Sequence, residues 1–356
     1  MLELSMMSTE AYQAMDSIPN LDESDLHFLS DAIVKSSRNR SRICTHRSSA
    51  ELLHEMFVIY GSDTFVRPNR HLGKDESVFV IRGACDTIFF DDAGNVTQVV
   101  SMGDQFSADA YFCRIPQGVY HTLIVRSAEI ILFEGTPGPL NPAETEYAEW
   151  GPQENDIIGI AEYRAFLNKE IASLGGPPNG QVIPLVQLGE LVYAASDAIV
   201  PFTRLESDFL LTQLHERSLD RVRICAHLSD SDRLHEMLMG FSNTTYVRPS
   251  LHVDKDESLF ILAGFATYYF FDAAGNIVDA VPLGPLGSSR SFYCRIPANT
   301  YHTLVVESDT IVVKETTSGP FERSATEYAP WAPDGTDPSA AADYLAGLGE
   351  AWERLS

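Results

Sequence analysis

The 356-residue sequence predicts an all-β-dominated fold that occurs twice in tandem, with short helices flanking each copy. Two observations lead to this prediction. The sequence repeats itself at a constant offset of 181 residues, and 50 of the 111 positions in residues 42–152 are identical in residues 223–333 without a gap. Within each copy, short runs rich in Val, Ile, Phe and Tyr recur between turn residues, at a spacing typical of a β-sandwich or barrel. A period of this length is that of a whole domain and not of a solenoid repeat.

The expected elements follow one another in the same order in both copies. Residues 8–36 and 189–218 are read as a short strand followed by a helix. The β runs of the first copy are residues 79–81, 87–90, 97–101, 111–115, 122–125 and 130–134. The sequence FDDAGN, repeated as FDAAGN, predicts a hairpin turn in which Gly or Asn supplies the positive φ. Residues 156–174 and 338–354 close the copies as helices.

The Gly- and Pro-rich segment GGPPNG marks the boundary between the copies. We therefore expect an N-terminal domain over residues 1–175, a linker over residues 176–181 and a C-terminal domain over residues 182–356.

Composition restricts the classes of function. A net charge of −25 argues against binding to nucleic acid or to an anionic membrane surface. Five cysteines without a CxxC pair favour reduced thiols, and neither a signal peptide nor an apolar run long enough to span a membrane is visible. We expect a cytoplasmic protein with a small-molecule substrate, and the sequence leaves a homodimer open.

Two histidines and a glutamate in each copy are the strongest candidates for chemistry. They are His71, Glu76 and His121 in the first copy and His252, Glu257 and His302 in the second. Two imidazoles and a carboxylate make a three-coordinate site with open positions, which suits non-haem Fe(II) and can also hold Zn²⁺, Mn²⁺ or Ni²⁺.

The spacing of these residues resembles the motifs of the cupin superfamily. His71-x4-Glu76-x6-Gly83 is similar to the later part of the first cupin motif, and Pro116-x-Gly118-x2-His121 to the core of the second. The second copy repeats both, with Asn299 at the position of Gly118. This resemblance implies a bicupin, that is, two double-stranded β-helix (jelly-roll) barrels in tandem.

Each copy further resembles the WbuC-type cupin metalloproteins, which are associated with surface-polysaccharide gene clusters. The residues that carry this likeness in the first copy are Arg42-x-Cys44-x-His46, Glu55-Met56, Arg67-Pro68, His71-x2-Lys74-x-Glu76, Phe90-Asp91-x2-Gly94, Ile115-Pro116, His121-Thr122 and Trp150-x-Pro152.

Both copies depart from the usual cupin pattern at one position. Cupins usually begin the first motif with HxH, whereas here Asn69 and Ser250 replace the first histidine. Each site is therefore expected to have three conventional ligands. We expect His46 and His227, or the carbonyl oxygen of Asn69, to be auxiliary ligands. The competing interpretation is a degenerate cupin that has lost its metal and keeps the barrel only as a scaffold.

Other polar residues are candidates for binding or proton transfer. Glu55 and Glu236 are proposed to line the barrel mouth as acid–base groups. The cations predicted to bind an anionic substrate are Arg42, Arg67, Lys74, Arg223, Arg248 and Lys255. Structural roles in packing or ion pairing remain the alternative for all of these residues.

The sequence leaves three functions open. The leading one is a metal-dependent oxidoreductase of the non-haem Fe(II) oxygenase or dioxygenase type, acting on a small polar or anionic molecule. The second is a non-redox isomerase or epimerase of sugar or polysaccharide metabolism, which the WbuC-type resemblance implies. The third is a non-catalytic bicupin that binds a small molecule.

Overall fold

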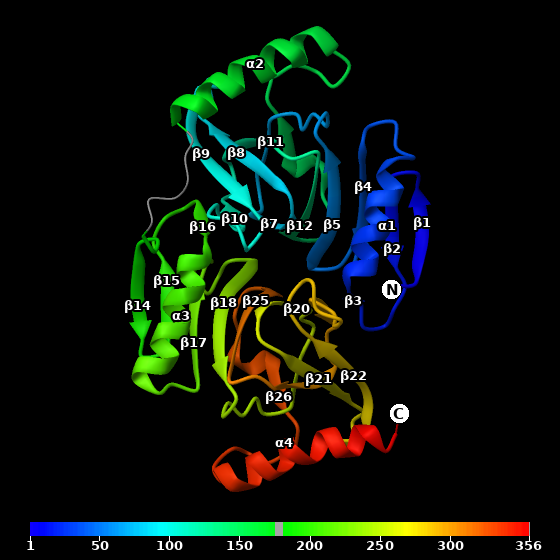
Figure 1. The fold of residues 1–356 in the computed structure, drawn as a ribbon, viewed down its shortest axis with the longest axis vertical. Helices are drawn as coiled ribbons and strands as arrows, with labels where there is room; N and C mark the ends of the chain where they lie inside the picture. Colours follow the sequence, from blue (N-terminus) through cyan, green and yellow to red (C-terminus); the bar gives the residue numbers. More distant parts are fainter. Residues whose placement is uncertain (175–180, 356) are drawn as a thin grey trace.

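Each copy of the repeat folds into two β-sheets that face one another, and helices cover the outside (Figure 1). The computed structural model describes residues 1–174 and 181–355. Apart from Gln181, the predicted linker therefore lies outside the described residues. We refer to residues 1–174 as the N-terminal copy and to residues 181–355 as the C-terminal copy.

The N-terminal copy contains one large and one small sheet. The large sheet has the order β1 (Leu4–Ser8), β2 (Ala11–Ala14), β4 (Arg40–Cys44), β5 (Leu53–Gly61), β12 (Glu129–Pro137), β7 (Glu76–Arg82), β10 (Phe112–Ile115) and β16 (Val200–Phe202). The small sheet has the order β13 (Thr145–Tyr147), β6 (Asn69–His71), β11 (Tyr120–Val125), β8 (Ala84–Phe90) and β9 (Val96–Gly103). A 3₁₀ turn, η1 (Pro142–Glu144), leads into β13.

The C-terminal copy repeats this arrangement. Its large sheet has the order β14 (Leu185–Gly189), β15 (Val192–Ala195), β17 (Arg221–Cys225), β18 (Leu234–Ser242), β25 (Thr310–Ser318), β20 (Glu257–Ala263), β23 (Tyr293–Ile296) and β3 (Asn20–Leu21). Its small sheet has the order β22 (Ile277–Leu283), β21 (Ala266–Phe271), β24 (Tyr301–Val306), β19 (Ser250–His252) and β26 (Thr326–Tyr328), and η2 (Arg323–Ala325) leads into β26.

Two of these strands belong to the large sheet of the other copy. β3 of the N-terminal copy pairs with β23, and Leu21 lies opposite Tyr293. Reciprocally, β16 of the C-terminal copy pairs with β10, and Phe202 lies opposite Phe112. The copies therefore exchange one short strand each, so neither large sheet is built from a single copy.

The central strands of the large sheets are buried on both faces. Because successive side chains of a strand point to opposite faces, Val58 and Val80 face the interior of the N-terminal barrel. Phe57 and Phe79 point the other way, into a core shared with Phe260 of the C-terminal copy. Burial on both faces explains why these strands read as continuous apolar runs and not as alternating ones.

Within residues 1–174 and 181–355, four helices flank the sheets. They are α1 (Glu23–Ile33), α2 (Ile157–Leu174), α3 (Arg204–Arg217) and α4 (Pro338–Glu353). Capping boxes start α1 at Asp22 and α3 at Thr203, where each cap side chain accepts a backbone N–H of the first turn. Leu167 of α2 and Leu348 of α4 pack on the outer faces of the small sheets, at opposite ends of the molecule in Figure 1.

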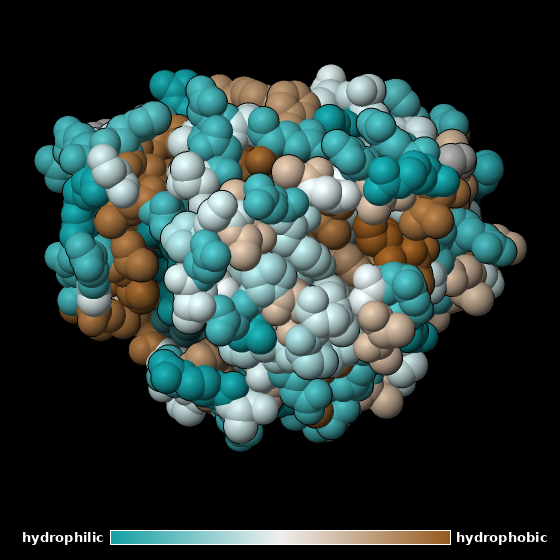
Figure 2. All heavy atoms as spheres, turned by 90° about the horizontal axis from the view of Figure 1, so that it is seen from below, coloured by the Kyte–Doolittle hydropathy of each residue, from teal (hydrophilic) through white to brown (hydrophobic). Residues whose placement is uncertain are grey.

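The all-β-dominated tandem fold predicted from the repeat is confirmed, and the fold is that of two jelly-roll barrels. The predicted hairpin turn is also present, and Gly94 with φ of +85° supplies the left-handed residue. The face of the molecule on the α4 side is largely hydrophilic, with separate hydrophobic areas (Figure 2). Over the part of the chain that the structure describes, no helix is long and apolar enough to cross a membrane.

Candidate metal centre

The two histidines and the glutamate predicted in the N-terminal copy meet at one point inside the barrel. Their potential ligand atoms all lie within 4.8 Å of one another. Glu76 Oε2 lies 2.8 Å from His71 Nε2 and 3.3 Å from His121 Nε2. β6, β7 and β11 supply one residue each, so the site joins the small sheet to the large one.

The C-terminal copy forms the same group from equivalent strands. Glu257 Oε2 lies 3.1 Å from His252 Nε2, and Glu257 Oε1 lies 3.4 Å from His302 Nε2. These atoms also meet the 4.8 Å limit. The repeat therefore encodes two similar three-residue groups, one in each barrel.

The other ring nitrogen of each histidine is already engaged. The Nδ1 atoms of His71 and His252 lie 3.1 Å from the hydroxyls of Thr145 and Thr326. Those of His121 and His302 lie 3.0 and 2.8 Å from backbone carbonyl oxygens two residues earlier. Partners of this kind direct the free Nε2 toward a metal, as is usual for metal-binding histidines.

The donor set fits a divalent metal ion. Glu76 Oε2 is buried and close to two imidazole nitrogens, yet it has no hydrogen-bond partner of regular geometry. A buried carboxylate oxygen that faces two converging imidazole nitrogens is an arrangement that suits the ligands of a divalent cation.

Electrostatics keep the glutamate of each group ionised. Burial raises the pKa of Glu76, but the adjoining imidazoles of His121 and His71 lower it further, so that the pKa lies well below its ordinary value. The pKa of Glu257 is likewise lowered, because the effect of His302 and His252 exceeds that of burial. Both carboxyls are therefore anionic at neutral pH, the form that binds a metal.

A cavity of about 820 Å³ opens onto the C-terminal group. Its wall includes His252, Glu257 and His302, so the group is accessible to a small molecule. A volume of this size lies in the range of small-molecule sites.

The structure places all three cations predicted for the C-terminal copy on the wall of this cavity. They are Arg223 of β17, Arg248 just before β19, and Lys255 just before β20. Arg248 also stacks on Tyr328, 4.9 Å from the ring centre, and Lys255 donates to the carbonyl oxygen of Pro320. Both side chains therefore contact the segment that contains Pro320 and Tyr328, near the end of the C-terminal copy, and also lie on the wall of the cavity.

The equivalent cations of the N-terminal copy, Arg42, Arg67 and Lys74, differ in burial and in their contacts. Arg42 is exposed on β4, whereas Lys74 is buried just before β7. Arg67 donates to the carbonyl oxygen of Ala148 at 2.9 Å and stacks on Tyr147 at 5.0 Å. Their predicted contact with a substrate stays a prediction.

The sequence interpretation missed one carboxyl in each barrel. Glu315 of β25 lies on the wall of the C-terminal cavity. Burial, followed by the nearby charge of Glu257, raises its pKa to about 8. Glu134 of β12 is its counterpart, and burial followed by Glu76 raises its pKa to about 7. A glutamate kept in both copies, shortly after the apolar runs of residues 130–133 and 311–313, was the signal that could have revealed this pair.

Glu55 and Glu236 do not line the barrel mouth, so their predicted placement as acid–base groups is wrong. Both are fully buried between the two copies. The period of a strand explains the error, because His235 lies on the wall of the cavity and the next residue must point to the opposite face. The preceding histidine, and not the glutamate, faces the site in β18.

The auxiliary ligands predicted from sequence are not part of the three-residue groups. The rings of His46 and His227 stack on His54 and His235 with centroids 4.2 and 4.0 Å apart. Their Nδ1 atoms lie 3.0 and 3.2 Å from the carbonyl oxygens of the buried glutamates in β5 and β18. Asn69 donates its amide to the carbonyl oxygen of Arg67, and its role as a ligand stays a prediction.

Comparisons with known proteins support the fold but do not identify a reaction for this chain. A family model described as a domain of unknown function, DUF6016, matches residues 21–102 and 208–283. No curated protein matches the sequence.

Solved structures of salicylate 1,2-dioxygenase from Pseudoaminobacter salicylatoxidans are similar in fold. One variant in complex with gentisate has a TM-score of 0.59 at 12% identity, and its alignment covers 88% of this chain and 86% of the dioxygenase chain. Another variant with gentisate has a TM-score of 0.58 at 10% identity, and its alignment covers 91% of this chain and 88% of the dioxygenase chain. A further structure of this dioxygenase has a TM-score of 0.56 at 12% identity, and its alignment covers 90% of this chain and 88% of the dioxygenase chain.

These likenesses and the topology define the chain as a bicupin in fold. The matches extend over nearly the whole length of both proteins, so they include both barrels. None of them bears on the resemblance to WbuC-type proteins, which stays a prediction.

Proposed function

We propose that this chain is a metal-dependent bicupin oxidoreductase of the oxygenase type, which acts on a small anionic molecule in the C-terminal cavity. One observation carries the proposal. The group His252, Glu257 and His302 lies on the wall of a cavity of about 820 Å³ that also presents three cationic side chains.

Each barrel would hold its metal ion through two imidazole Nε2 atoms and one carboxylate. Iron(II) is the ion we favour, because a two-histidine, one-carboxylate set is typical of non-haem iron oxygenases, whereas Zn²⁺, Mn²⁺ or Ni²⁺ also fit such donors. When bound, iron(II) would supply redox chemistry with dioxygen, since three protein ligands leave coordination positions open.

The remaining side chains of the cavity would bind and orient the substrate. Arg223 and Arg248 offer guanidinium groups, which suit a carboxylate or a phosphate. Met237, Met239 and Leu259 give the same cavity an apolar wall for the body of the molecule. An anion with an apolar body is therefore the substrate class that fits best.

Glu315 would hold a proton in the cavity. In the metal-free cavity, burial, followed by the nearby charge of Glu257, raises the pKa of this carboxyl to about 8 and so favours its neutral form at pH 7. A neutral carboxyl can donate a hydrogen bond or a proton to a bound substrate, which an ordinary glutamate cannot do at this pH.

The structural likeness to salicylate 1,2-dioxygenase supports testing aromatic carboxylates first, because two of those structures contain gentisate. Anaerobically purified protein is analysed for metal per chain, and oxygen uptake is then measured with salicylate, gentisate and related hydroxybenzoates. We expect bound metal, and oxygen uptake that the double variant His252→Ala/His302→Ala abolishes. Its counterpart His71→Ala/His121→Ala is the matched control. Protein that carries no metal and is unaffected by a chelator would contradict the proposal.

A non-redox isomerase or epimerase is the second candidate, and Glu315 is the observation that favours it. Proton transfer at a substrate carbon needs a group whose pKa lies near the working pH, and this carboxyl meets that condition. Turnover of a sugar phosphate or nucleotide sugar without oxygen consumption, lost in Glu315→Gln, would favour this reaction over the first.

A further inference from the structure

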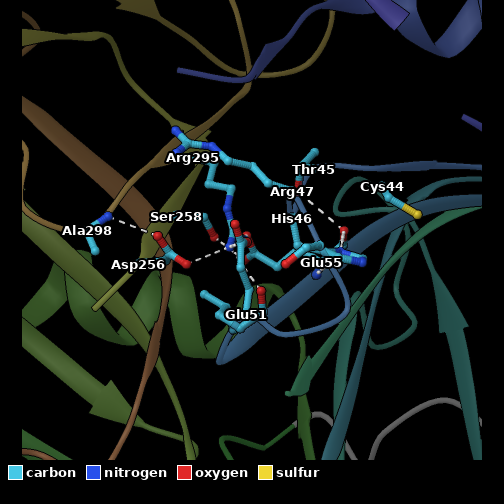
Figure 3. Close-up of polar contacts among 12 residues, drawn as sticks. Cys44, Thr45, His46, Arg47, Glu51, Glu55, Asp256, Ser258, Arg295 and Ala298 are labelled. Carbon is cyan, nitrogen blue, oxygen red and sulfur yellow. Dashed lines mark hydrogen bonds and ion pairs between the residues drawn. The ribbon is translucent and has the colours of Figure 1, made fainter. Parts of the chain in front are cut away.

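Two buried ion clusters lie between the two copies, at positions related by the 181-residue repeat. The first surrounds Arg295 and contains Glu51 and Glu55 of the N-terminal copy together with Asp256 of the C-terminal copy (Figure 3). The second surrounds Arg114 and contains Asp232 and Glu236 of the C-terminal copy together with Asp75 of the N-terminal copy. Each cluster thus combines an arginine of one copy with carboxylates of both.

The first cluster is densely connected. Arg295 Nη2 donates at 2.9 Å to Glu51, to Asp256 and to the carbonyl oxygen of Leu53, and its Nη1 donates to Glu55. Glu55 is fully buried and also accepts from Tyr293, at 2.8 Å, and from Ser258. A buried carboxylate with this many donors is fixed in position, because each lost bond would leave a polar group unsatisfied.

This cluster holds the strand segment that carries the candidate metal ligand Glu257. Asp256 and Ser258 flank that glutamate, and both contact the cluster while Glu257 itself faces the cavity. Asp256 Oδ1 also accepts from the backbone N–H of Ala298 at 2.9 Å, in the loop that leads to His302. Two of the three ligand-bearing segments are therefore tied to one buried carboxylate and its arginine.

The N-terminal copy also fixes the backbone of the arginine. Arg295 N donates to the carbonyl oxygen of Pro19 at 2.8 Å, next to the exchanged strand β3. Side chain and main chain of Arg295 are thus both anchored by residues that lie outside its own barrel.

The second cluster makes the reciprocal connections and has one further member, Lys314 of the C-terminal copy, whose Nζ lies 2.8 Å from Glu236 Oε1. Arg114 Nη2 lies 2.6 Å from Asp75, and its Nη1 lies 3.5 Å from Glu236. Ser77 donates to Glu236 at 2.6 Å, and Asp75 accepts from Gln117 N at 2.9 Å. Asp75 and Ser77 flank the candidate ligand Glu76, and the loop at Gln117 leads to His121. The site of the N-terminal copy is therefore tied to a glutamate of the C-terminal copy.

We propose that Glu55 and Glu236 are positioning residues, and that each sets the metal affinity of the site in the opposite copy. The inference rests on the metal sites of the proposed function. Its physical basis is that residues around metal ligands orient them, and that their loss typically weakens metal binding about 10- to 100-fold. Here those residues come from the other barrel.

The test uses full-length chains in which one site is disabled. His71→Ala/His121→Ala leaves only the C-terminal site, and His252→Ala/His302→Ala leaves only the N-terminal site. Glu55→Gln is added to each background, and Mn²⁺ alone is titrated while free Mn²⁺ is followed by electron paramagnetic resonance. We expect about 10-fold weaker binding at the C-terminal site and less than about threefold change at the N-terminal site.

Glu236→Gln is the matched control and should give the opposite pattern. A purely structural effect would weaken both sites or follow the copy that carries the substitution, so the crossed pattern is specific to positioning. Equal losses, or losses confined to the substituted copy, would overturn the inference. Parent chains that bind neither Mn²⁺ nor, in an anaerobic titration, Fe²⁺ would overturn the proposed metal sites and the inference with them.

A milder pair of variants is available if either glutamine variant fails to fold. Glu51 and Asp232 contact the same arginines at 2.9 and 3.3 Å, and their side chains are each about one-fifth exposed. Glu51→Gln and Asp232→Asn should reproduce the crossed pattern with a smaller change, and its absence would again overturn the inference.

Discussion

The stacked histidines His46 and His227 should make the metal-free protein sensitive to mild acid. Each has only 8% of its surface exposed. Burial is the main cause that lowers the pKa of each to about 4, and the stacked neighbours His54 and His235 add to it. A protein that keeps these rings neutral loses stability when the unfolded chain can take up protons that the folded chain cannot.

The sign and size of the effect follow from these values. The folded pKa lies below the ordinary 6.5, so the stabilising contribution is complete above pH 6.5 and is lost as the pH falls toward 4. A fall from 6.5 to about 4 corresponds to about 3 kcal/mol per histidine. By pH 5, about 2 kcal/mol per histidine is already lost.

Urea unfolding of chelator-treated protein between pH 8 and pH 5 tests this reasoning, because that range stays above the isoelectric point of about 4.6. The variant His46→Gln/His227→Gln should lose about 4 kcal/mol less than the wild type over the range. His27→Gln, at an exposed position on α1, is the control and should follow the wild type. If the double variant showed the same pH dependence as the wild type, the assignment of neutral buried rings would be refuted.

Three further outcomes are expected. Removing metal with a chelator should lower the melting temperature in calorimetry, because an ion that binds only the folded state stabilises it; an unchanged temperature would argue against bound metal. Lys314→Met should lower stability in urea unfolding, because Lys314 is 1% exposed and lies 2.8 Å from buried Glu236; the loss should be smaller than the about 3–5 kcal/mol of a buried charge left without a partner, because Glu236 keeps Arg114, and a stability equal to the wild type would contradict a stabilising pair. Gly275→Ala should lower the melting temperature, because Gly275 has φ of +90° and its added Cβ would lie 2.7 Å from Trp331. Gly347→Ala is the control and should not lower it, because a Cβ at this position of α4 meets open space. Equal changes in the two variants would contradict this explanation.

The fold and the metal groups could be predicted because their signals lie within each copy. His71, Glu76 and His121 keep a motif spacing, and the repeat presents the same spacing a second time. A β-rich pattern with turn residues then suffices to assign the barrel, and the structure brings the three side chains together as expected.

The remaining parts of the site depend on contacts between distant segments. β5 and β18 are buried on both faces, so no alternation of polar and apolar residues indicates whether His54 or Glu55 faces the barrel. Glu315 was missed because it stands between Lys314 and Thr316, so that no alternation of polar and apolar residues shows which way its side chain points. The exchanged strands β3 and β16 are two and three residues long, too short for any periodicity to reveal.

The strand exchange has a consequence for how such a chain can arise. A protein with a single copy would present an open edge beside its β10-like strand and a β16-like segment without a sheet of its own. Two identical molecules related by a two-fold axis could complete each other through the same pairings. The association of two such molecules would depend on their concentration. Gene duplication would join them in one chain and so make the association permanent. In this chain the second copy is in effect a tethered subunit, and cutting the tether should leave two pieces that still need each other to fold.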